Sequence, residues 1–247
     1  MATVYVPIRR LPGTRHDHRF FPAMAVLLTT AMGVGFAPTY FLAGVFQARL
    51  PGVLIHIHGV VFTAWFVLLL VQSALASSGR LSVHRKLGIA GITIAAAMLP
   101  LGLLATAEYT HRLASHYHIL MASIMPCAEL FTFAILVTAA FLLRKRPDWH
   151  KRLILLATIA IIGAAVGRME FLPYWTFHGN AALRLAWAYT YPFLVLLIAY
   201  DLWSLRRLHL ATLWGSVFII GIHQLSLLVD LTAPWLAFAA WLQSWNL

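Results

Sequence analysis

Long apolar runs are the feature that most limits what this chain can become. Runs of about 20 apolar residues, enough to cross the hydrocarbon core of a bilayer as a helix, recur between short polar segments. Hydrophobic residues make up 62% of the chain and charged residues 10%, a balance that a soluble domain could not cover with a polar surface. The sequence therefore predicts an all-α, polytopic integral membrane protein surrounded by the lipid bilayer.

Seven transmembrane helices are predicted, and the short loops between them indicate a single domain covering residues 1–247. We expect residues 1–21 to form a cytoplasmic tail and the second to fifth spans to form a central four-helix bundle. The stretch 234–246 is too short to cross again and contains three tryptophans, so we expect an interfacial helix on the outer face. The predicted spans lie near residues 22–46, 54–76, 87–106, 117–143, 152–172, 182–203 and 210–231.

The basic residues are distributed among alternating loops. The formal net charge is +11, but this distribution argues against nucleic acid as a partner and for a role in membrane orientation. The loops assigned to the outside carry only Arg49, Arg112 and Arg184. The positive-inside rule therefore places the N-terminus in the cytoplasm, and a bacterial inner membrane is the expected location. The inner segments carry Arg9, Arg10, Arg15, Arg19, Arg80, Arg85, Lys86, Arg144, Lys145, Arg146, Lys151, Arg152, Arg206 and Arg207.

Four successive predicted helices, the second to the fifth, each begin with a histidine. Because these helices alternate in direction, His58 and His118 enter near the outer face, and His84 and His150 enter near the inner face. Helices one apart in sequence are commonly diagonal in a four-helix bundle, and diagonal histidines can hold a haem through its iron. The pattern predicts two haem sites, stacked so that electrons could pass between the two faces of the membrane.

Other polar residues in the apolar runs are candidates for the same site. Gln72 follows His58 by fourteen residues on one helical face, so we expect it to line the interior. Arg168 follows His150 by eighteen residues, which is five helical turns. Its expected anionic partner is Glu170, Glu129, Asp230 or a carboxylate of a bound ligand.

Two acidic residues carry separate expectations. Glu129 lies deep in an apolar run, where a carboxyl is costly, and is a candidate for proton handling, ion pairing or the environment of a cofactor. Asp201 lies at the carboxyl end of a predicted helix, where the helix dipole disfavours an anion. We expect Asp201 to be neutralised by Arg206, Arg207 or His209.

This pattern of paired histidines resembles the ascorbate-reducible, dihaem transmembrane b-type cytochromes. The resemblance implies that His58, His118, His84 and His150 are axial ligands of haem b, that electron transfer is the activity, and that a redox partner exists. The segments HRKLGIAG and WHKRLILLATIAIIGAAVGR also resemble an uncharacterised group of bacterial polytopic membrane proteins with His-Arg-x-Leu-Gly signatures. This second resemblance covers roughly the second to fifth spans and implies no activity.

Two other classes of function stay open from the sequence. One is a metal-dependent membrane oxygenase or hydrolase that holds iron, copper or zinc in the outer half, although no HxxxH or HExxH pair occurs. The other is a subunit without a cofactor, which packs against partners in a membrane protein complex. The single Cys127 excludes an internal disulfide and a cysteine-ligated cluster within one chain. Candidate ligands of the alternative metal site are His56, His58, His116, His118, His178, His223, Glu129, Glu170 and Asp230.

Overall fold

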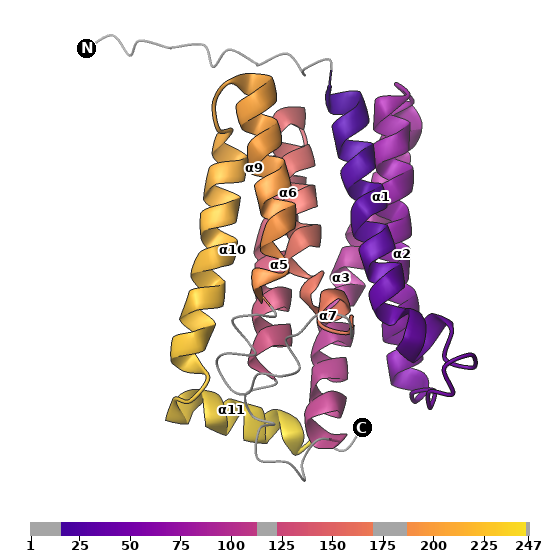
Figure 1. Cartoon of the computed structure of the whole chain (residues 1–247), viewed down its shortest axis with the longest axis vertical. Coiled ribbons are helices and arrows are strands. Elements are labelled where there is room, and N and C mark those ends of the chain that lie inside the picture. Colours follow the sequence, from indigo (N-terminus) through magenta and orange to yellow (C-terminus); the bar gives the residue numbers. More distant parts are fainter. Residues whose placement is uncertain (1–15, 113–122, 170–186, 246–247) are drawn as a thin grey trace.

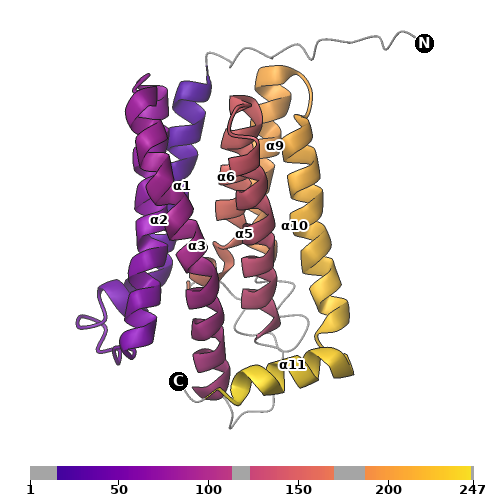
Figure 2. The same cartoon turned by 180° about the vertical axis from the view of Figure 1, so that it is seen from behind.

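The computed structural model describes residues 16–112, 123–169 and 187–245, and every regular element in this part of the chain is a helix. Most of the helices run side by side, while the last one lies across their ends (Figures 1 and 2). The elements are α1 (Asp17–Phe36), the π-helical turn η1 (Ala37–Phe41), α2 (Val53–Ser77), α3 (Leu81–Arg112), α5 (Ile124–Leu142), α6 (Pro147–Ala160), α7 (Gly163–Val166), α9 (Tyr191–Leu205), α10 (Leu210–Val229) and α11 (Ala233–Gln243).

Six helices in the described ranges are long and apolar enough to cross a membrane, and α9 is a shorter apolar helix of 15 residues. A helical polytopic membrane protein is therefore confirmed. The longest helix, α3, begins at Leu81, earlier than the predicted span at 87–106, so that His84 lies inside its first turn. The first parts of the predicted spans 117–143 and 182–203 lie outside the described residues.

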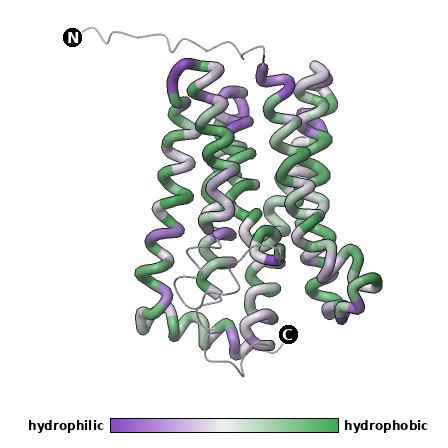
Figure 3. Tube along the Cα trace, in the orientation of Figure 1, coloured by the Kyte–Doolittle hydropathy of each residue, from purple (hydrophilic) through white to green (hydrophobic). Residues whose placement is uncertain are grey.

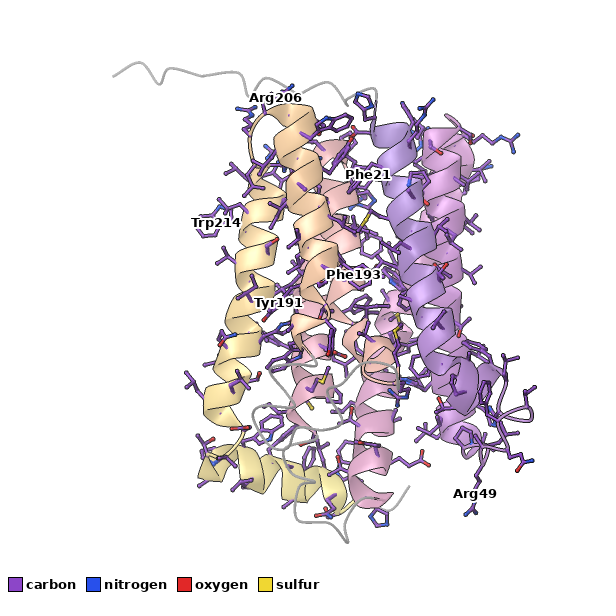
Figure 4. All side chains as sticks on the ribbon, in the orientation of Figure 1. Phe21, Arg49, Tyr191, Phe193, Arg206 and Trp214 are labelled. Carbon is purple, nitrogen blue, oxygen red and sulfur yellow. The ribbon has the colours of Figure 1, made fainter. Side chains whose placement is uncertain are left out.

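Apolar side chains cover the outward faces of the helices. Figure 3 shows hydrophobic residues along the middle of the helices and hydrophilic residues gathered towards their ends. Trp214 on α10 is 63% exposed and points away from the neighbouring helices (Figure 4). Ile89 on α3 and Leu228 on α10 are 68% and 75% exposed. In water such surfaces would be unfavourable, whereas lipid chains match them.

Helix α6 is the centre of the packing. It contacts α1, α5, α9 and α10, and every residue of its stretch 152–160 except Ile154 is buried. Neighbouring contacts join α1 to α2, α2 to α3, α3 to α5, α5 to α6 and α6 to α1. The helices α1, α2, α3, α5 and α6 therefore form a ring of contacts in which α1 lies between α2 and α6.

Trp65 fills part of the interior of this ring of five helices. It is 3% exposed on α2, and its indole N–H donates to the Thr158 hydroxyl of α6 at 3.1 Å. Its ring meets Phe133 of α5 edge-on, with 5.1 Å between the centroids. A buried indole with a satisfied N–H thus joins three helices.

The two ends of the helical layer differ in charge. Arg206 lies at the end from which α1 starts, whereas Arg49 lies at the opposite end (Figure 4). The α2–α3, α5–α6 and α9–α10 connections all lie at the first end. These connections and the helix ends beside them carry most of the described basic residues, among them Arg80, Arg144 and Arg207. Helix α11 lies across the second end, against α3.

Candidate functional site

His84 and His150 meet near the strongly basic end of the molecule. His84 lies in the first turn of α3, and His150 lies in the first turn of α6, which begins with Pro147. Their ring centroids are 6.4 Å apart and their planes are nearly perpendicular, at 88°. The structure thus brings together two imidazoles from chain positions 66 residues apart.

A backbone carbonyl orients each of these rings. The His84 Nδ1–H donates to the carbonyl of Gln72 on α2 at 3.3 Å, and the His150 Nδ1–H donates to the carbonyl of Ala140 on α5 at 2.9 Å. This assignment follows from the acceptors, because a carbonyl can only accept. It leaves Nε2 of each ring as the nitrogen with a lone pair, which is how a carbonyl commonly prepares a histidine to bind a metal.

The distance between the two ring centroids has the size that two imidazoles bound to one metal ion would show. With metal–nitrogen distances of about 2.0–2.1 Å, two imidazoles on opposite sides of an ion have ring centroids roughly 6–6.5 Å apart. The observed 6.4 Å lies in that range. Helices α3 and α6 have little or no direct backbone packing, so the two histidines span the gap between helices that are not neighbours. This is the diagonal relationship that bis-histidine haem ligation requires.

Gln72 lies next to this pair. Its side-chain Nε2 donates to the backbone carbonyl of His84 at 3.2 Å. Gln72 of α2 and His84 of α3 therefore each donate a side-chain hydrogen bond to the other's backbone carbonyl. The Gln72 Oε1 atom is buried and has no hydrogen-bond partner in the described part of the chain. The structure therefore places Gln72 beside His84, fourteen residues and almost four turns from His58.

His56 and His58 lie at the opposite end of α2 from Gln72, in separate surroundings. The His56 Nδ1 shares a hydrogen bond of 3.0 Å with the Tyr40 hydroxyl of η1. His58 stacks on Phe62 with 4.1 Å between centroids, and its Nδ1 is buried without a partner among the described residues. Its predicted partner His118 lies outside the described residues, as do His116, His178 and Glu170. The outer haem pair therefore stays a prediction.

Arg168 and Glu129 lie on the same side of the molecule as His58, away from the His84–His150 pair. The Arg168 guanidinium donates to the carbonyl of Ala164 at 2.5 Å and lies over the Phe36 ring, 4.7 Å from its centroid. Its charge acts on both Glu129 and His58. Glu129 is 6% exposed and forms none of the ion pairs found among the described residues. Of the expected partners, Glu129 is therefore near Arg168 without a direct ion pair.

His223 lies in an aromatic stack of its own. Its ring is parallel to that of Trp187 within 4°, at 4.4 Å, and its Nδ1 is 3.4 Å from the Tyr191 hydroxyl. In the three described stretches, no group of three or more His, Cys, Asp or Glu side chains could hold a metal ion. The described members of the alternative metal set (His56, His58, His223, Glu129 and Asp230) therefore do not gather into one site.

The structure corrects the expectation for Asp201. Its carboxylate pairs with the buried Arg152 of α6, with Nη2 to Oδ1 at 2.5 Å, and not with Arg206 or Arg207. The Thr212 hydroxyl donates to Oδ2 at 2.5 Å, and His209 contributes its backbone N–H at 3.2 Å. The sequence did contain an indication of this pair. Arg152 and Asp201 are charged residues in otherwise apolar runs, and such charges usually pair.

His209 completes this network outside the membrane-spanning segments. It is the N-cap of α10: its Nδ1 accepts from the Ala211 N–H at 3.1 Å, while its Nε2–H donates to Asp148 Oδ2 at 3.2 Å. Burial, together with the positive charge of Arg152, lowers the pKa of His209, and Asp148 and Asp201 oppose this shift. The neutral imidazole is therefore the form that caps the helix.

Comparison with known proteins does not assign the chain to a family. No protein-family model matches it, and no curated protein or solved structure gives a match. The functional argument consequently depends on the geometry of this molecule.

Proposed function

We propose that this protein is a membrane b-type haem protein that carries electrons, with His84 and His150 as the axial ligands of one haem. The observation that carries the proposal is the pair of imidazoles, 6.4 Å apart, with both Nδ1 atoms engaged by carbonyls and both Nε2 atoms left for a metal. Of the ligand sets considered from the sequence, this is the one whose described members lie together.

The chain's own residues would bind and orient the group. A bound haem supplies a one-electron couple whose potential depends on its axial ligands and their surroundings. His84 and His150 would fix its iron from two sides, and the carbonyls of Gln72 and Ala140 would hold the rings in place. Phe141, whose ring centroid is 6.5 Å from that of His150, adds an apolar wall that limits the access of water.

The finer topology belongs to the same proposal. We take α9 to be part of a seventh span, α11 to lie at the outer membrane interface, and α2, α3, α5 and α6 to be the haem-binding core. The gathering of basic residues at the end where α1 begins supports a cytoplasmic N-terminus. A bacterial inner membrane, a redox partner and a second haem held by His58 and His118 complete the proposal.

A visible spectrum of the purified protein tests the proposal. We expect a Soret band that shifts on reduction, and a measured ratio of haem to protein. His84→Ala and His150→Ala should each lower that ratio strongly, because removing one axial ligand leaves the iron held from one side. His56→Ala is the matched control, since His56 pairs with Tyr40 at the other end of α2, and it should retain the band.

Two results would overturn the proposal. One is haem bound in full by both variants, which would exclude His84 and His150 as ligands. The other is wild-type protein with no Soret band after expression with excess haem. Elemental analysis then separates the remaining classes: stoichiometric iron, copper or zinc without haem supports the metal-dependent enzyme, and no metal supports the subunit without a cofactor.

A further inference from the structure

Glu129 lies where an ionised carboxylate would be poorly stabilised. It is in the second turn of α5 and 6% exposed, and its Oε1 has no hydrogen-bond partner in the described parts of the chain. An unpaired carboxylate away from water costs many times more than a neutral carboxylic acid, so such groups either pair or take up a proton. No described cation pairs with Glu129 directly.

The carboxyl group lies against an interruption of the central helix. Helix α6 ends at Ala160 and the short α7 begins at Gly163. The N–H groups of Ile161 and Ile162 bond three residues back, at 3.3 Å each, in place of the usual four. Interrupted helices inside membranes are tolerated where the backbone is buried in protein, and they frequently mark sites for ions or protons.

Gly163 makes room for Glu129 at this interruption. A Cβ atom added at Gly163 would overlap Glu129 Oε1 and the end of Met125. The carboxyl oxygen therefore lies directly against the backbone of the interruption. Any side chain at position 163 would displace it.

The charges around Glu129 come from three directions. The titratable and charged groups in the outer halves of the elements packed against α5, and in the segment after α7, belong to three parts of the chain. They are Glu108, Tyr109, His111 and Arg112 of α3, Arg168 after α7, and His223 and Asp230 of α10 and its C-cap. Arg168 is the one whose charge acts on Glu129. Its guanidinium donates to the Ala164 carbonyl and lies over the Phe36 ring, and it forms no direct ion pair with Glu129 among the described residues.

We propose that Glu129 is a proton-binding site in the outer half of the protein, and that at neutral pH its ligand is a proton and not a metal cation. The site is built from the α5 carboxyl, the interruption between α6 and α7, and the space left by Gly163. It goes beyond the proposed function, because the His84–His150 pair lies at the opposite end of the helices. The proposal does not depend on whether the protein binds haem.

Infrared spectroscopy of the purified protein tests this site. At neutral pH we expect the carbonyl band of a protonated carboxylic acid, absent in Glu129→Gln and retained in Glu108→Gln. Glutamine matches the neutral acid in shape and charge, so the variant should fold; if it does not, Glu129→Asp should shift the band. A band unchanged in Glu129→Gln, or in Glu129→Asp, would overturn the proposal. So would a band that disappears in sodium chloride but not in choline chloride at the same pH, which would identify a cation site.

A measurement without mutations gives a second test. A hydrophobic carbodiimide forms a stable adduct with protonated carboxyl groups in apolar surroundings, and peptide mass spectrometry locates the adduct. We expect an adduct on Glu129 that decreases as the pH is raised. Asp201 is the internal control, because it is also buried but ion-paired with Arg152, and it should not react. Modification of Asp201 with none on Glu129 would contradict the proposal.

Discussion

Arg152 and Asp201 form a buried ion pair that joins two helices 49 residues apart in the chain, with 2.5 Å between Nη2 and Oδ1. Their side chains are 2% and 0% exposed. The Thr212 hydroxyl and the His209 N–H complete the coordination of the carboxylate. One anion therefore connects the basic ends of α6, α9 and α10.

Asp201→Asn should destabilise the protein by about 3–5 kcal/mol, because it leaves Arg152 charged and buried without its counter-ion. The measurement is the free energy of unfolding in mixed detergent micelles. Lys151→Gln is the comparison variant: Lys151 pairs with Asp17, and these side chains are 24% and 13% exposed. Partial access to water should make the loss of stability smaller than in Asp201→Asn. Equal losses in the two variants would contradict this ranking.

The sequence predicted the helices well and this partnership poorly, for one physical reason. An apolar run predicts a helix from the local sequence alone, because a segment in lipid must form its backbone hydrogen bonds within itself. Six long apolar helices are confirmed. A charge pair depends on which helices become neighbours. Arg206 and Arg207 are closer to Asp201 in sequence, but Arg152 is closer in space because α6 occupies the centre of the packing.

Gly35→Ala should be destabilising by about 1–3 kcal/mol, the usual cost of overpacking a close contact. Gly35 of α1 lies against the backbone of Ala165 in α7, and an added Cβ would overlap the Ala165 carbonyl. Backbone at this position cannot move aside as a flexible side chain can. Thermal unfolding of the purified protein measures the effect.

Gly33→Ala provides the matched control for the same helix. A Cβ at Gly33 would have no atom of another element within 4 Å, so the gain in helix propensity should make the change neutral or stabilising by up to about 1 kcal/mol. If both alanine variants unfold at the same temperature, the close approach of α1 and α7 is not a determinant of stability.

His209 should make stability sensitive to mild acid. Its pKa is lowered in the folded protein, chiefly by burial, so the unfolded chain binds a proton more readily. The contribution of His209 is thus fully present above the ordinary pKa of 6.5 and is lost as the pH falls below it. Protonation of Nδ1 would also remove the bond from the Ala211 N–H.

His209→Asn isolates this effect. Asparagine is a good N-cap and does not titrate, so the variant should keep α10 capped while losing part of the decrease in stability below neutral pH. Unfolding temperatures measured over a series of pH values would show this. An identical pH dependence in wild type and variant would exclude His209 as the sensitive group.

The candidate site could be predicted from the sequence only in part, for a related reason. Alternating helix direction is fixed by the chain's repeated crossing, so the common depth of His84 and His150 could be inferred from the sequence. The interruption after Ala160 could not, since the apolar run continues through it and Gly163 is its one local signal. The position of Gln72 beside His84, and not beside His58, follows from the register of α2 against α3.

Replacing one proposed axial ligand with methionine should change the haem without removing it. In His84→Met or His150→Met, the remaining histidine keeps its carbonyl partner, and a thioether supplies the other ligand. Histidine–methionine ligation raises the reduction potential relative to a bis-histidine pair. Redox titration of the visible spectrum should therefore show a midpoint shifted upwards, whereas His56→Met should titrate like wild type. Retention of the wild-type midpoint in both axial variants would mean that any bound haem is held elsewhere.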